Sequence, residues 1–237
     1  MNQRKIKILV IDDEKPTLSM FKLFLNAYGY EVYIAEDGVK GLALFDEISP
    51  EIVFTDIKMP GIDGLEVLRR IRKTGKPSEV IIITGHGDME KAVEALDLNA
   101  SDFINKPVER LALNSALARA EKRRKMPLNQ CFEFSESRDK HRLVISIKGK
   151  FTSSAKDAFS VLFKDESLLN VKEVCMTLDD SFSIDRSGIS LLMEIIQNLK
   201  QGGVLIVMEN LSYNYARVFQ MAGIDKIALL KEAWPVE

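Results

Sequence analysis

The chain has little cysteine, little net charge and no long apolar segment. Its 237 residues include two cysteines, Cys131 and Cys175, which lie far apart and in no metal-ligand spacing. A disulfide framework and a cysteine-bound zinc site are therefore not expected. A formal net charge of -2 gives no general attraction to nucleic acid or to anionic membranes. With no membrane-length apolar run and no signal-peptide pattern at the N-terminus, we expect a cytoplasmic location.

The first half of the chain alternates short apolar runs with helical patterns. Some runs, such as Ile81-Ile82-Ile83, are apolar throughout, as in strands buried on both faces of a parallel sheet. Five strand–helix units with short connections predict an α/β fold with a doubly wound, five-stranded parallel sheet. The predicted strands are Ile6–Ile11, Val32–Ala35, Ile52–Thr55, Val80–Thr84 and Asp102–Asn105.

The charged run that ends this half predicts a domain boundary. A helix from residue 109 to 125 is followed by Pro127, which cannot continue it. Its last turn either contacts an anionic partner or is a solvated helix end, and the second is favoured. We expect a first domain at 1–125, a linker at 126–131 and a second domain at 132–237.

In the second domain we predict strands at 131–136, 143–148, 174–178, 204–208 and 226–230, helices at 154–163, 187–200 and 213–221, and a loop at 179–186.

Polar side chains follow the ends of the predicted strands in the first half. They are Asp12, Asp13, Asp56, Thr84 and Lys106. Because the carboxyl ends of parallel strands share one edge of a sheet, these side chains should lie together. Three carboxylates at one edge favour Mg²⁺, which prefers oxygen ligands. Asp56 can then attack phosphorus and form an acyl phosphate, with Lys106 and Thr84 donating to phosphoryl oxygens.

Four segments of the first half resemble the receiver domains of two-component response regulators. The resemblance covers residues 1 to about 125, and the combination of segments is much more specific than any one of them. It implies a flavodoxin-like fold, with Asp56 phosphorylated by a sensor histidine kinase. The segments are Ile8–Asp13, Thr55–Gly64, Ile83–Asp88 and Phe103–Pro107.

The same resemblance assigns roles to individual residues. It implies that Asp12, Asp13, Asp56 and the backbone carbonyl of Lys58 hold Mg²⁺. Thr84 and Phe103 would form the pair that switches on phosphorylation, and the Lys106–Pro107 peptide would be cis. Lys58 and His86 occupy two positions that are thought to tune dephosphorylation, although a lone histidine in a loop is more often only solvated.

The second half resembles a STAS domain, the fold of anti-sigma factor antagonists. This resemblance covers residues 132–237 and implies a small α/β domain with a mixed sheet. Its sharpest motif is the turn Asp185-Arg186-Ser187-Gly188, which would form the interaction loop. Asp185 or Ser187 can cap the following helix, and Gly188 allows close backbone approach. The matching segments are Val144–Gly149, Val174–Leu178, Phe182–Gly188 and Gly203–Met208.

Arg186 departs from the pattern of antagonists that switch partners. In those proteins, the residue after the aspartate is usually a serine or threonine that a kinase phosphorylates. Arginine cannot accept phosphate, and Ser187 is better explained as a helix cap. Our hypothesis is that the receiver controls the STAS domain. An aspartyl phosphate at Asp56 would replace the missing serine phosphate as the on–off signal.

The resulting prediction is a signalling protein whose phosphorylated receiver controls protein binding by the STAS domain. Expected partners are a histidine kinase and an anti-sigma-type kinase, a phosphatase or another protein. We expect no binding of nucleic acid or membrane, because no helix-turn-helix or basic stripe is visible. We also expect no enzyme activity beyond the receiver's own phosphorylation and dephosphorylation. A phosphatase of the haloacid dehalogenase type needs Asp-x-Asp-x-Thr, whereas Asp56 precedes Ile57-Lys58.

Two alternatives stay open at this point. The STAS domain could be a constitutive protein- or ligand-binding module, with the receiver controlling dimerisation. A homodimer could form along the apolar positions of the last receiver helix, but these positions could equally pack on the receiver's own sheet, which we favour. The positions are Leu113, Ala116, Leu117 and Ala120.

Overall fold

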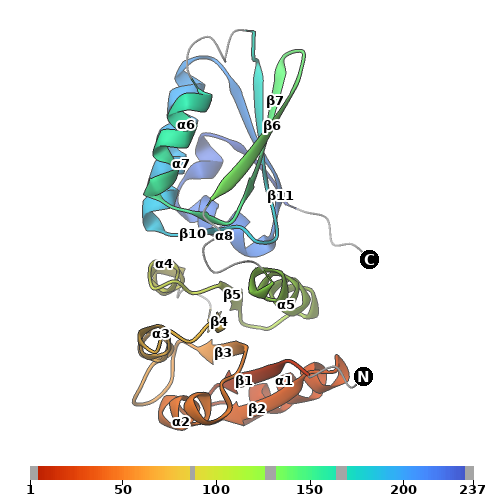
Figure 1. Ribbon diagram of the computed structural model, residues 1–237, viewed down its shortest axis with the longest axis vertical. Helices are drawn as coiled ribbons and strands as arrows, with labels where there is room; N and C mark the ends of the chain where they lie inside the picture. Colours follow the sequence, from red (N-terminus) through yellow and green to blue (C-terminus); the bar gives the residue numbers. More distant parts are fainter. Residues whose placement is uncertain (1–4, 86–88, 126–131, 164–169, 233–237) are drawn as a thin grey trace. The chain divides into compact units, whose positions relative to one another are not determined.

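The computed structural model describes residues 5–85, 89–125, 132–163 and 170–232. It divides into two compact units, Met1–Lys125 and Met126–Glu237 (Figure 1). The linker predicted at 126–131 lies outside the described residues. Among the described helices, none is both long and apolar enough to cross a membrane.

The first unit is a five-stranded parallel sheet with the strand order β2-β1-β3-β4-β5, which confirms the predicted fold. Ile8 and Val10 pack against helices α1 and α5, whereas Ile11 abuts Gly41 of α2, so alternate residues of β1 face opposite layers. The strands are β1 (Lys7–Ile11), β2 (Glu31–Ala35), β3 (Ile52–Asp56), β4 (Glu79–Thr84) and β5 (Asp102–Asn105); the helices are α1 (Lys15–Ala27), α2 (Gly38–Ile48), α3 (Gly64–Lys73), α4 (Met89–Asp97) and α5 (Arg110–Arg124).

Helix α5 is bound to its own sheet along most of its length. The four apolar positions considered as a dimer seam are buried in the core with α1 and the sheet, so the favoured alternative of packing on the sheet is confirmed. Arg119, on the same helix, is buried and pairs with Asp102 of β5. At the helix end, Arg123 pairs with Glu79 at 3.0 Å and Arg124 lies 3.6 Å from Glu51. Two basic side chains of the charged last turn therefore form ion pairs with acids of the same unit.

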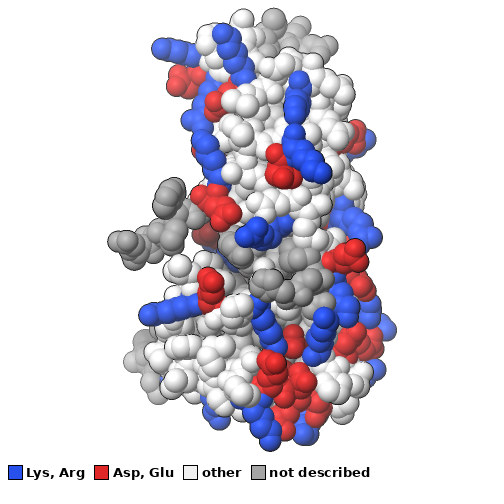
Figure 2. All heavy atoms as spheres, turned by 180° about the vertical axis from the view of Figure 1, so that it is seen from behind, with Lys and Arg blue, Asp and Glu red and all other residues white. Residues whose placement is uncertain are grey.

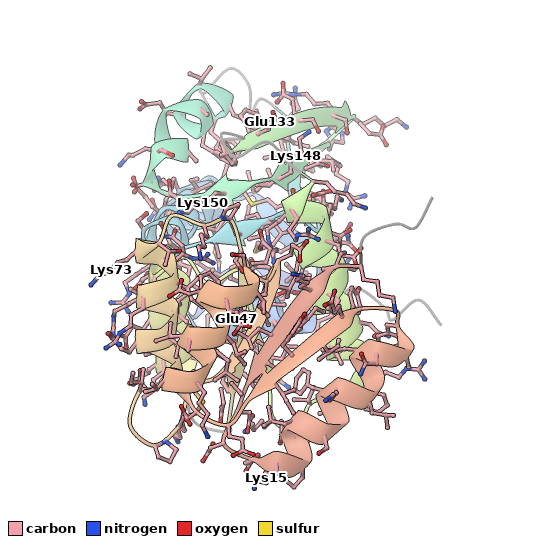
Figure 3. The ribbon with its side chains drawn as sticks, turned by 60° about the horizontal axis from the view of Figure 1, so that its bottom comes forward. Lys15, Glu47, Lys73, Glu133, Lys148 and Lys150 are labelled. Atoms are coloured by element: carbon pink, nitrogen blue, oxygen red, sulfur yellow. The ribbon has the colours of Figure 1, made fainter. Side chains whose placement is uncertain are left out.

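The second unit has a mixed sheet, as predicted, and its strand order is β12-β11-β9-β7-β6. The β6–β7 pair is antiparallel and the other pairs are parallel. Glu133 and Lys148 face each other across β6 and β7, 2.8 Å apart (Figure 3). The strands are β6 (Glu133–Asp139), β7 (Arg142–Lys148), β8 (Lys150–Phe151), β9 (Glu173–Leu178), β10 (Ser183–Ile184), β11 (Leu205–Leu211) and β12 (Leu229–Glu232); the helices are η1 (Ser153–Ala155), α6 (Lys156–Leu162), α7 (Arg186–Gln201), α8 (Tyr213–Met221) and η3 (Ile224–Lys226).

Two local predictions in this unit are wrong. The last strand, predicted at 226–230, begins only at Leu229, because Gly223 has a φ of 78° and starts the tight turn η3. The segment 179–186, predicted as a loop, contains β10, which pairs with β8. A two-residue pairing has no periodicity that a sequence pattern could reveal.

Charged side chains of both signs lie together on one face of the second sheet and on the face drawn in Figure 2. On the face drawn in Figure 2, basic and acidic side chains lie interspersed. On the second sheet, Arg142 pairs with Glu173 at 2.7 Å and with Glu209 at 3.2 Å, and Lys231 pairs with Glu209 at 3.0 Å. Exposed pairs of this kind contribute little to stability individually.

Candidate functional site

The predicted polar residues converge at the carboxyl edge of the first sheet. Register places Thr55 beside Ile11, Asp56 beside Ile83 and Thr84 beside Asn105, so the strands end at one level. One ligand oxygen from each of Asp12, Asp13 and Asp56 lies within 4.8 Å of the others. The edge therefore carries a compact acidic cluster, as expected from the strand ends.

Asp12 and Asp56 are buried, whereas Asp13 is exposed. Burial raises the pKa of both buried carboxyls above the ordinary value, although Lys106 opposes this shift. Asp12 Oδ1 accepts a hydrogen bond from the backbone N–H of Glu14 at 2.8 Å. Its Oδ2 is buried and has no hydrogen bond of ordinary geometry among the described atoms, only an ion pair with Lys106.

Lys106 reaches into this cluster from the end of β5. Its Nζ lies 2.9 Å from Asp56 Oδ2, 3.1 Å from Asp12 Oδ2 and 3.1 Å from Glu14 Oε2. Burial lowers the pKa of Lys106, but the hydrogen bonds and charges of these carboxylates outweigh burial and raise the pKa above its usual value. The Lys106–Pro107 peptide is cis, as the receiver resemblance implied. Lys106 is thus a charged donor held next to Asp56.

Thr84 and Phe103 lie on the neighbouring strands β4 and β5, and both are buried. The Thr84 hydroxyl donates to Asn105 Oδ1 at 3.1 Å, and a longer contact of 3.4 Å reaches the Gly85 carbonyl. Asn105 was not predicted as a site residue. The available signal was its position at the end of β5, immediately before Lys106.

Asp56 opens a loop that leads to α3. Lys58, whose backbone carbonyl was predicted as a metal ligand, has an exposed side chain in this loop. Asp63 caps α3 by accepting a hydrogen bond from the backbone N–H of Glu66 at 2.8 Å. A Cβ on Gly64 would lie 2.1 Å from the Asp56 carbonyl oxygen, so no other residue fits without moving the backbone. His86 lies outside the described residues.

Replacing Gly64 with alanine should disturb the acceptor loop. The added Cβ would push the Asp56 carbonyl away, which costs about 1–3 kcal/mol as an overpacked site does. We expect weaker phosphorylation of Asp56 together with this loss of stability, measured by labelling with acetyl phosphate and by urea unfolding. The matched control is Gly75→Ala, where nothing lies within 4 Å of the added atom and only the positive φ of 68° is strained. Equal labelling of both variants would contradict the prediction.

The acidic cluster fits a hard divalent cation. Three carboxylates supply oxygen ligands, and a buried oxygen of Asp12 lacks a hydrogen bond. Mg²⁺ prefers this kind of ligand and keeps several waters, which the exposed side of Asp13 allows. Asp12, Asp13 and Asp56 are therefore the side chains that could hold it.

The predicted interaction loop of the second unit begins helix α7. Asp185 is the N-cap and accepts from the backbone N–H of Gly188 at 2.8 Å. The Ser187 hydroxyl donates to Asp185 Oδ1 at 2.7 Å and accepts from the backbone N–H of Ser153 at 3.0 Å. A Cβ on Gly188 would lie 2.2 Å from the Phe151 carbonyl oxygen. Arg186 and Ser187 are exposed, so the loop presents their side chains at the surface.

Comparison with known proteins finds two families in this chain. The family model for the response regulator receiver domain matches residues 8–118, and the model for the STAS domain matches residues 94–233. Response regulator MprA of Mycobacterium sp. (strain KMS) is 37% identical over 114 residues, which cover 48% of this chain and 48% of that protein. Transcriptional regulatory protein FixJ of Bradyrhizobium diazoefficiens is 38% identical over 118 residues, which cover 48% of this chain and 58% of that protein.

The similarity to these curated relatives is confined to part of each chain. The match to MprA spans about half the length of that relative. Among solved structures, a response regulator receiver domain protein from Clostridium thermocellum is 41% identical, with a TM-score of 0.49, over 51% of this chain and 97% of that one.

The parallel sheet, the acidic cluster and the matched family model define the first unit as a response regulator receiver domain, a domain of two-component signalling. The chain belongs to the STAS domain family, whose model matches more than half of it, and it joins that domain to the receiver.

Proposed function

We propose that Asp56 accepts a phosphoryl group from a sensor histidine kinase, and that the acyl phosphate controls protein binding by the STAS domain. One observation carries the proposal. Asp56 is buried at the end of β3, with Lys106 Nζ 2.9 Å from its Oδ2 and with Asp12 and Asp13 in the same acidic cluster.

The residues of the site divide the chemistry among them. Asp12, Asp13, Asp56 and the backbone carbonyl of Lys58 would hold Mg²⁺, which neutralises charge on the acids and on the incoming phosphoryl group. An Asp56 oxygen attacks phosphorus, and the bond from phosphorus to the kinase histidine nitrogen breaks. Lys106 donates to a phosphoryl oxygen. The Thr84 hydroxyl gives up its hydrogen bond to Asn105 and donates to another phosphoryl oxygen instead. Phe103 moves together with Thr84.

The STAS domain is the output of this switch in our proposal. Its loop at Asp185–Gly188, in which Arg186 and Ser187 are exposed, would meet an anti-sigma-type kinase or a phosphatase in the cytoplasm. Arg186 stands where a partner-switching antagonist usually carries a phosphorylated hydroxyl. The Ser187 hydroxyl already donates to Asp185, the N-cap residue of α7, and accepts a hydrogen bond from the Ser153 backbone N–H. These two features support control from Asp56 rather than from phosphorylation of this loop.

Capture of partners from a lysate of the source cell tests the proposal. One sample of the full chain carries Mg²⁺ and beryllium fluoride, a phosphoryl mimic, and the other is Asp56→Ala. We expect a kinase-like or phosphatase partner in one sample only, which also reveals whether phosphorylation promotes or blocks binding. The same partners in both samples would mean that the STAS surface binds constitutively.

The alternative function is a constitutive protein- or ligand-binding STAS module whose receiver controls dimerisation. Light scattering after size exclusion, with and without beryllium fluoride, distinguishes it from partner switching. A change in mass without a change in captured partners would favour this alternative.

A further inference from the structure

Glu14 is a third carboxylate next to Lys106. It is neither the predicted phosphoryl acceptor nor one of the predicted metal ligands. Its Oε2 lies 3.1 Å from Lys106 Nζ and accepts a hydrogen bond from the Thr17 hydroxyl at 3.0 Å. The Glu14 side chain is 58% exposed, whereas those of Asp12 and Asp56 are almost fully buried. Glu14 therefore contacts the ammonium group from the solvent side.

Phosphorylation of Asp56 would bring phosphoryl oxygens to the ammonium group of Lys106, which is already surrounded by carboxylates. A lysine ammonium has three N–H donors, and three carboxylate oxygens stand within 3.1 Å of Lys106 Nζ. A phosphoryl oxygen on Asp56 would then share the ammonium group with the two other carboxylates, Asp12 and Glu14. Asp12 is in the cluster that can hold a cation, and Asp56 itself carries the phosphoryl group. Glu14 remains as the carboxylate that competes with the phosphoryl group for the ammonium.

We infer that Glu14 is a positioning residue that acts through Lys106. It holds the ammonium group in the resting site and weakens the hold of Lys106 on the phosphoryl group. This inference rests on the proposed phosphorylation of Asp56. Because Glu14 is largely exposed, its competition is modest, and removing it should strengthen binding of a phosphoryl mimic about three-fold, as for a surface ion pair.

Binding of beryllium fluoride in the presence of Mg²⁺, followed by ¹⁹F NMR on the full chain, tests this inference. We expect Glu14→Gln to bind about three-fold more tightly than wild type. Glu14→Asp keeps the charge but is one methylene shorter, so it should lose the contact and behave like Glu14→Gln. Glu36→Gln is the matched control, because it removes an acid that pairs with Lys15 and Lys40 instead of Lys106. It should bind as wild type does.

Each other outcome has a distinct meaning. Tighter binding in Glu14→Gln but not in Glu14→Asp would reduce the effect to general charge and overturn the inference. Equally tight binding in Glu36→Gln would also overturn the inference. Unchanged binding in Glu14→Gln would overturn it as well. If wild type itself binds no beryllium fluoride, the proposed function at Asp56 fails instead.

Discussion

Replacing Asp56 with asparagine should reduce phosphoryl incorporation from acetyl phosphate to background. Asparagine has nearly the same size but offers a neutral amide, which is not a nucleophile towards phosphorus. Three carboxylates surround Lys106, and the change removes the one that stands at the end of β3. Labelling of the intact chain, followed by Phos-tag gel electrophoresis or intact mass, measures the result.

Asp46→Asn is the matched control for this experiment. Asp46 is an exposed acid on α2 that pairs with Lys76 at 3.2 Å, and it has no role in the proposed chemistry. The control should be labelled as strongly as wild type. Substantial labelling of Asp56→Asn would show that another residue accepts the phosphoryl group, and the proposed function would then need a different acceptor.

Replacing Arg119 with methionine should destabilise the receiver by about 3–5 kcal/mol, the cost of leaving a buried charge without its partner. Arg119 Nε and Nη2 lie 2.6 and 2.5 Å from Asp102 Oδ2, and both residues are at most 5% exposed. Asp102 Oδ1 also accepts from the Phe103 backbone N–H at 2.9 Å. Urea unfolding of the full chain, with hydrogen exchange of β5 and α5 peptides, measures the loss.

Arg110→Met is the control on the same helix. Arg110 is exposed at the start of α5 and bonds the Tyr28 hydroxyl at 3.2 Å, so its loss should change stability by no more than about 0.5 kcal/mol. The double variant Asp102→Asn with Arg119→Met should recover part of the loss, because no charge is then left unpaired. Equal stability of the two single arginine variants would contradict a structural role for the buried pair.

The receiver fold could be predicted closely because its strands have a simple pattern. Runs such as Ile52–Thr55 are apolar throughout, and the structure extends each of the five predicted strands by at most one residue or trims it by one. Since the carboxyl ends of parallel strands share an edge, the predicted parallel sheet also placed Asp12, Asp56 and Lys106 together. Periodicity and topology were sufficient for these features.

Other features depend on pairings that no periodicity contains. Glu14 resembles any acid at a helix start, and its bond to Lys106 joins residues 92 positions apart. Arg119 stands among apolar helix positions, and only the fold shows that Asp102 faces it. In the second unit, the apolar pattern predicts a strand at 226–230, but the turn after Gly223 delays that strand to Leu229.

The crowded contact at Gly64 gives the acceptor site two mechanically different sides. Towards α3, backbone meets backbone, because the Asp56 carbonyl abuts Gly64 and the Gly64 N–H bonds the Ile57 carbonyl at 3.0 Å. Towards β5, the Thr84 hydroxyl holds Asn105 by a side-chain bond that rotation can break. A phosphoryl group added at Asp56 therefore has a close backbone contact on the α3 side and a breakable side-chain hydrogen bond on the β5 side. We therefore expect helix α3 to move together with the end of β3, and any rearrangement on phosphorylation to occur on the β4–β5 side.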